Sequence, residues 1–98
     1  MIEAADRVLV VGLGLASRAH LPTWARACSL LVGIGDSHDV LAARRECAHL
    51  DNVMFAPGDR HEIPWRDAYF TVIIDTESAE PSPAMLRVLA PEGRVTSP

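Results

Sequence analysis

The amino-acid sequence predicts an α/β fold in which helices cover both faces of a mainly parallel sheet. Three observations support this class: short continuous apolar runs, segments of helical period between them, and turn residues where most runs end. Strands buried on both faces of a parallel sheet are apolar throughout, whereas strands with one exposed face alternate. The length suits one hydrophobic core, so we expect a single domain over residues 1–98.

Five segments have the composition of strands. Residues 7–11 and 30–34 are rich in valine, leucine and isoleucine, and residues 69–74 ("YFTVII") form another strong run. The run at 52–56 is weaker, and residues 94–96 begin a fifth strand as the chain stops. Right-handed crossovers between parallel strands then predict a doubly wound, Rossmann-like sheet of about five strands in the order 3-2-1-4-5.

The segments between the strands have helical patterns. A helix that begins near Asp39 has one apolar face, and an apolar stripe over residues 85–89 predicts a helix that stops before Pro91. Pro22 lies inside the segment that follows the first strand, where proline removes a helical hydrogen bond. We therefore expect that helix to be kinked or to begin near Leu21.

Composition and charge exclude several classes of protein. The net charge is −4, and the nine basic residues are scattered arginines, which disfavours nucleic acid and anionic membranes as partners. The apolar runs are shorter than the roughly 18 residues that span a bilayer, so we expect a soluble, cytoplasmic protein. Cys28 and Cys47 have no metal-ligand spacing, nor do the histidines, so we expect no metal.

Polar and glycine residues follow the strands at the edge of the sheet where ligands bind in such folds. Gly12 and Gly14 would let the backbone approach a ligand, or simply make a tight turn. Asp36 can accept both ribose hydroxyls of an adenosine ligand, or cap a helix. Asp59 can accept a bond from an adenine amino group, or shape a turn. Two acids within residues 75–77 face a substrate or are ordinary loop acids.

The segments "NVMFAPGDRHEIPWRDAYFTVII" and "MLRVLAPEGRVTS" resemble class I methyltransferases that use S-adenosylmethionine, and among these the methyltransferase type 11-like proteins. In that family a strand ends in Gly-Asp and precedes an apolar-Pro-aromatic turn, which Gly58-Asp59 and residues 63–65 match. The family's helix ending Leu-x-Pro-x-Gly matches residues 89–93. The resemblance covers most of the chain from about Val8 onward.

This resemblance implies methyl transfer from S-adenosylmethionine to a small acceptor that the sequence does not name, with no catalytic residue assigned. It places Gly12 and Gly14 beside the methionine part of the cofactor. Asp36 lies within one position of the family's ribose-binding acid. Asp59 matches the residue that bonds the adenine amino group, and Arg60 would lie beside the adenine ring edge.

Some positions depart from the family pattern. Val10 replaces an acid of the first strand, Ala16 replaces the third glycine, and Thr71 replaces a strand aspartate. The chain also stops at the fifth strand, where the family continues with an antiparallel pair.

Two alternatives remain open at this point. "VGLGLASRAHLP", followed by "GIGD" about 20 residues later, is also similar to NAD(P)-binding oxidoreductases. The other alternative is a non-catalytic module that binds a nucleotide or a partner.

The fifth strand also predicts the state of association. An edge strand exposes unpaired N–H and C=O groups, and a second copy of the chain can pair with them. We therefore expect a homodimer with two-fold symmetry that binds a small-molecule ligand.

Overall fold

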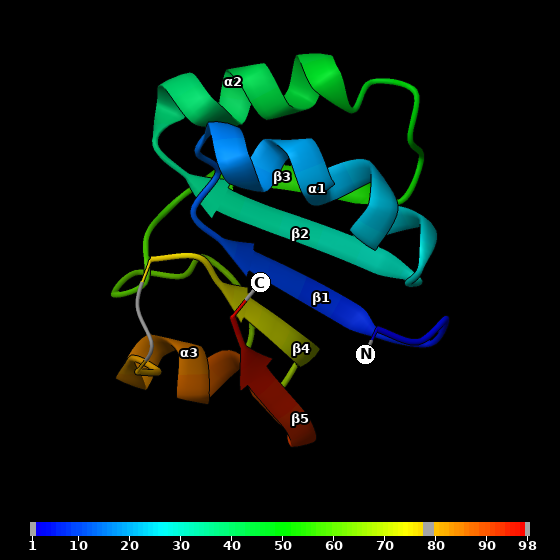
Figure 1. Ribbon diagram of the computed structural model, residues 1–98. Helices are drawn as coiled ribbons and strands as arrows, with labels where there is room; N and C mark the ends of the chain where they lie inside the picture. The colour runs from blue at the N-terminus through cyan, green and yellow to red at the C-terminus, as the bar shows by residue number, and fades with distance from the viewer. Residues whose placement is uncertain (1, 78–79, 98) are drawn as a thin grey trace.

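The structure, a computed structural model, describes residues 2–77 and 80–97. Its described strands form one parallel sheet in the order β3-β2-β1-β4-β5 (Figure 1), which confirms the predicted fold class and strand order. The strands are β1 (Arg7–Val11), β2 (Leu30–Gly35), β3 (Val53–Pro57), β4 (Phe70–Asp75) and β5 (Leu89–Thr96).

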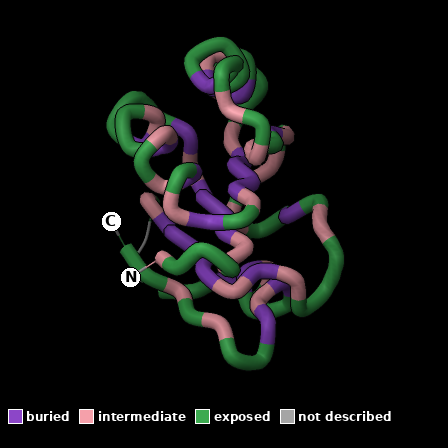
Figure 2. Tube along the Cα trace, turned by 90° about the vertical axis from the view of Figure 1, so that its right-hand side faces the viewer, coloured by how far each residue is buried: buried purple, intermediate pink, exposed green. Residues whose placement is uncertain are grey.

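Helices and a long connection cover the two faces of the sheet. The helices of the described residues are α1 (Leu15–Arg26), α2 (Ser37–Glu46) and α3 (Pro83–Val88). Apolar side chains of α1 and α2 pack with one face of β1, and those of α3 and the 58–69 connection pack with the other. Figure 2 shows the buried residues concentrated in the strands between these layers. The doubly wound arrangement follows from this alternation of buried side chains along β1.

Two sequence predictions about element boundaries are wrong. Of the two alternatives for the first helix, a start near Leu21 is wrong, because α1 runs from Leu15 to Arg26 with Pro22 inside it. Its face formed by Ser17, Leu21 and Ala25 is buried, and this packing maintains the helix across the proline.

The second wrong boundary is the start of the fifth strand, which is Leu89 and not Arg94. A register shift in the β4–β5 pairing, between Phe70 and Val72, makes room for the extra residues of β5. A bulge of this kind has no clear signature in the apolar pattern of the sequence.

Thr71 has a structural role at the amino ends of β1 and β4. Its hydroxyl donates to Asp6 Oδ1 at 2.8 Å and accepts from the backbone N–H of Arg7 at 2.9 Å. The backbone N–H of Glu3 and, less strongly, the Thr71 hydroxyl lower the pKa of Asp6, although burial opposes them. The ionised Asp6 therefore stabilises the fold above its unfolded pKa, and that contribution is lost as pH falls through the lower folded pKa.

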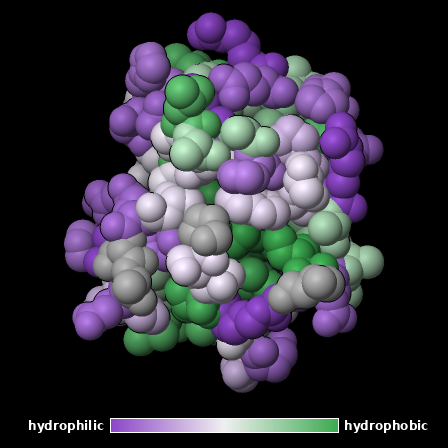
Figure 3. All heavy atoms as spheres, in the orientation of Figure 1, coloured by the Kyte–Doolittle hydropathy of each residue, from purple (hydrophilic) through white to green (hydrophobic). Residues whose placement is uncertain are grey.

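The remaining sequence expectations of the fold concern the two cysteines and the membrane. Cys28 and Cys47 are free thiols in the core on the α1–α2 side, and burial raises the pKa of both. None of the helices that the structure describes has the length and hydrophobicity required to cross a bilayer. Figure 3 shows hydrophobic side chains near the middle of the view, where Figure 1 places β1 and β4, with hydrophilic ones around them.

Candidate functional site

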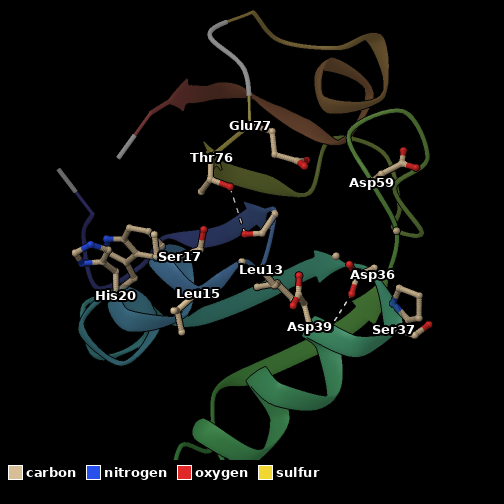
Figure 4. A pocket seen from close by; sticks show the side chains of 17 residues that line it. Leu13, Leu15, Ser17, His20, Asp36, Ser37, Asp39, Asp59, Thr76 and Glu77 are labelled. Atoms are coloured by element: carbon tan, nitrogen blue, oxygen red, sulfur yellow. Dashed lines mark hydrogen bonds between the residues drawn. The ribbon is translucent and has the colours of Figure 1, made fainter.

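A cavity of about 880 Å³ lies where β1, β2, β3 and β4 end, at the carboxyl edge of the sheet. The strand order reverses between β1 and β4, and α/β sheets bind ligands at such a switch point. Four of the predicted site residues line the cavity: Gly12, Gly14, Asp36 and Asp59. Figure 4 labels Asp36 and Asp59 among the lining residues. The structure thus brings together residues that lie up to half the chain apart.

Gly12 follows β1 directly and packs against Thr76 and Glu77, which follow β4. Its φ of +98° is a left-handed conformation that side chains disfavour, and a Cβ there would lie 2.3 Å from the Thr76 Oγ1. The Thr76 hydroxyl itself donates to the carbonyl of Val11 at 2.7 Å. The fold therefore requires glycine at position 12 independently of any ligand.

Gly14 differs from Gly12 in its backbone conformation and in the space around its Cβ position. Its φ of −64° and ψ of 172° suit any residue, and it precedes α1 without a side-chain cap. Nothing lies within 4 Å of the position that its Cβ would occupy. Since Gly14 lines the cavity, this open space is part of the cavity, and a side chain would fill some of it.

Asp36 caps α2, because its Oδ1 accepts from the backbone N–H of Asp39 at 2.8 Å. The helix-capping interpretation of Asp36 is therefore correct. The side chain is exposed at the cavity, and no other hydrogen bond to it occurs among the described residues. Capping occupies one carboxylate oxygen and leaves the second available to a ligand hydroxyl.

Asp36 also belongs to a group that the sequence analysis missed. One ligand atom each of Asp36, His38 and Asp39 lies within 4.8 Å of the others. Arg18 pairs with Asp39 at 3.2 Å and so already compensates part of the negative charge of this group. Asp39 is thus engaged in an ion pair within the protein.

Asp59 shapes the turn that follows β3. Its Oδ1 accepts from the backbone N–H groups of His61 at 2.8 Å and Glu62 at 3.0 Å. The turn interpretation is therefore correct, and Oδ2 has no hydrogen-bond donor among the residues that the structure describes. Like Asp36, Asp59 combines a local structural role with one free acceptor at the cavity.

Arg60 is the predicted site residue that does not line the cavity. Its Nη2 lies 3.4 Å from Oδ2 of Asp75, whose side chain is only 2% exposed, and also donates to the carbonyl of Glu80. Asp75 and Glu77 are the two acids at the end of β4, and Asp75 is therefore buried against Arg60. Glu77 lines the cavity next to Gly12.

Side chains of α1 form a wall of the cavity that the sequence analysis did not identify. Ala16, His20 and Trp24 lie along one line of the helix and all line the cavity, with the His20 and Trp24 rings stacked at 5.4 Å. The signal was their four-residue spacing, which places them beside the buried stripe that begins at Ser17. The spacing could not be interpreted from the sequence, because Pro22 left the first residue of this helix undetermined.

A glycine turn at the switch point of a doubly wound sheet defines the chain as a member of the Rossmann-like α/β class. No protein-family model matches the chain, and no curated protein sequence matches it significantly. Solved structures match it over nearly its whole length, and the chain has the fold of class I methyltransferases.

Three of these structures illustrate the similarity. An S-adenosylmethionine-dependent methyltransferase from Aquifex aeolicus is 20% identical with a TM-score of 0.85, covering 99% of this chain and 57% of its own. A phosphoethanolamine N-methyltransferase from Haemonchus contortus, solved with phosphoethanolamine and S-adenosylhomocysteine, is 12% identical with a TM-score of 0.77, covering 99% of this chain and 22% of its own. The [4+2]-cyclase SpnF is 28% identical with a TM-score of 0.77, covering 97% of this chain and 39% of its own.

These matches favour the methyltransferase resemblance, and nothing in them supports the nicotinamide-dependent alternative. The chain spans between 22% and 57% of the three matched chains. One of the three is a cyclase, and one fold carries many activities. The fold is therefore shared, and the activity has to be argued from the site.

Proposed function

We propose that the cavity binds S-adenosylmethionine and that the protein takes part in methyl transfer to a small acceptor. The observation that carries this proposal is Gly14, whose missing side chain serves no contact within the protein and leaves the cavity open. Open space beside a backbone turn is what a closely bound ligand requires.

The other lining residues fit the parts of this cofactor. The free oxygen of Asp36 suits a ribose hydroxyl, and the free oxygen of Asp59 suits the adenine amino group. Gly12 and Gly14 then lie beside the methionine part. The lining includes four carboxylates, of which Asp39 is paired with Arg18, and no lysine or arginine among the described residues. The remaining negative charge favours a cation such as the sulfonium.

The chemistry needs little from the protein beyond placement. When bound, the cofactor supplies an activated methyl group on its sulfonium. The chain's own part is to orient that group toward the acceptor, which is a large share of catalysis in such reactions. Glu77 and the stacked His20–Trp24 pair line the cavity beside the glycine turn, where an acceptor would approach.

Calorimetric titrations with S-adenosylhomocysteine and with NAD test the cofactor assignment. We expect saturable binding of S-adenosylhomocysteine and no heat with NAD. Binding of NAD alone would support the oxidoreductase alternative, and binding of neither would contradict the proposal.

We expect Asp59→Ala to weaken S-adenosylhomocysteine binding by about 1–3 kcal/mol, the cost of leaving a buried donor unpaired. This variant also loses the acceptor of the His61 and Glu62 amides. Asp59→Asn is the sharper variant, because the amide oxygen can keep that turn while its NH₂ group cannot accept from adenine. Calorimetry on both variants gives the measurement. Unchanged affinity in Asp59→Asn would remove Asp59 from the site.

We also propose that the protein forms a homodimer, which is supported by the position of β5 at the edge of the described sheet. Its outer N–H and C=O groups can pair with a second copy. Light scattering coupled to size exclusion should give twice the 10.6 kDa of the chain. A mass of one chain that does not change on concentration would contradict the dimer. The cytoplasmic location also stays a prediction.

A further inference from the structure

Arg60 and Asp75 connect two walls of the cavity that are remote in sequence. Arg60 follows Asp59 in the turn after β3, and Asp75 ends β4 two residues before Glu77. Their side chains meet at 3.4 Å, and the Asp75 carboxylate is almost fully buried. An ion pair in so little water is screened weakly by salt.

Each partner of this ion pair also holds the backbone of one wall. The other oxygen of Asp75, Oδ1, accepts from the backbone N–H of Glu77 at 3.0 Å. The carbonyl of Arg60 accepts from the hydroxyl of Ser82, which also caps α3 by accepting from Met85 N–H at 3.2 Å. The turn after β3 is thus attached to both ends of the β4–α3 connection.

The contacts made by Nη2 hold the Arg60 side chain in its position. Its Nε is buried without a hydrogen-bond partner among the described residues, whereas Nη2 contacts both Asp75 and the Glu80 carbonyl. A buried donor without a partner is unfavourable, so the two Nη2 contacts have to outweigh that loss. This differs from the place beside the adenine ring that the family resemblance implies for Arg60.

We propose that Arg60 and Asp75 are positioning residues that hold Asp59 and Glu77 at a fixed separation across the cavity. The inference rests on the proposed function, because Asp59 and Glu77 would face opposite ends of the cofactor. Neither Arg60 nor Asp75 lines the cavity, so both act through their neighbours. Loosening one wall should therefore loosen the other.

Amide hydrogen exchange on the complete chain, followed by NMR without ligand, tests the coupling directly. In Arg60→Met we expect the amides of His61, Glu62 and Glu77 to exchange about tenfold faster together, the effect of losing one charge-assisted hydrogen bond. Asp75→Asn should change them less, since its side-chain oxygen still accepts from Glu77. If the Glu77 amide is unaffected in Arg60→Met, the coupling is overturned.

Matched variants separate positioning from a general loss of structure. Arg66→Met removes an exposed arginine of the same connection that stacks on Tyr69 and should leave all three amides unchanged. Arg60→Lys keeps the positive charge and should restore part of the protection. Should Arg60→Met fail to fold, the exchange of the same three amides is compared between Asp75→Asn and Arg66→Met. A larger acceleration in Asp75→Asn than in Arg66→Met then supports the coupling. Equal acceleration in Arg66→Met would overturn the proposal.

Titration with S-adenosylhomocysteine then connects the coupling to the ligand. We expect Arg60→Met to lower the affinity about tenfold and Arg60→Lys to recover part of it. If the parent chain does not bind this ligand while its exchange is coupled, the proposed function fails and the coupling between the walls stands. Binding that is intact in Arg60→Met, with exchange unchanged at Glu77, overturns the positioning role and leaves the function standing.

Discussion

Phe70→Ala should lower the free energy of unfolding by about 3–5 kcal/mol, because it empties a large volume in the core. Phe70 begins β4, is fully buried, and packs its ring against Tyr69 edge-on at 5.1 Å and against Trp65 at 5.9 Å. Domains of this kind are stable by only about 5–15 kcal/mol, so the variant loses a large part of its stability. Urea denaturation followed by circular dichroism gives the measurement.

Leu86→Ala is the matched control for this core variant. Leu86 lies on α3 on the same face of the sheet but is 57% exposed, so we expect a change within about 0.5 kcal/mol. Phe70→Leu, which leaves a smaller cavity, should lie between the two. A loss in Phe70→Ala as small as that in Leu86→Ala would mean that this side of the sheet is not a packed core.

The sheet could be predicted because each buried strand is marked in the sequence by a continuous apolar run. Side chains of β1 alternate between the two core clusters, and a strand buried on both faces must be apolar at every position. The strand order then follows from chain order and from the hand of the crossovers. The start of β5 could not be predicted in the same way, because the register shift after Phe70 depends on the pairing with β4.

The site could be predicted only where a residue follows directly from a strand end. Gly12, Asp36 and Asp59 each stand one or two residues after a strand, so the topology alone brings them together. The wall formed by His20 and Trp24 depends on which face of α1 is buried, and that required the helix boundaries. The place of Arg60 depends on a buried partner 15 residues away, which no local pattern specifies.

Gly12 and Gly14 should respond to alanine differently, because only one of the two substitutions strains the fold, and this contrast is the sharpest test of the cavity. In Gly14→Ala the backbone conformation is allowed and the new Cβ meets no protein atom, so we expect stability to change by less than about 0.5 kcal/mol. The methyl group fills space that the ligand needs, and we expect S-adenosylhomocysteine to bind about 10- to 100-fold more weakly. Calorimetric titration and urea denaturation on one preparation give both quantities.

Gly12→Ala should also lower stability, because the new Cβ lies 2.3 Å from the Thr76 Oγ1 in a left-handed backbone conformation. The strain alone costs about 1–2 kcal/mol, and moving Thr76 away from the Val11 carbonyl adds to it. We therefore expect Gly12→Ala to lose both stability and binding, whereas Gly14→Ala loses binding alone. If Gly14→Ala retained full affinity, the open space beside the turn would not be ligand volume, and the assignment of the cavity as the cofactor site would be wrong.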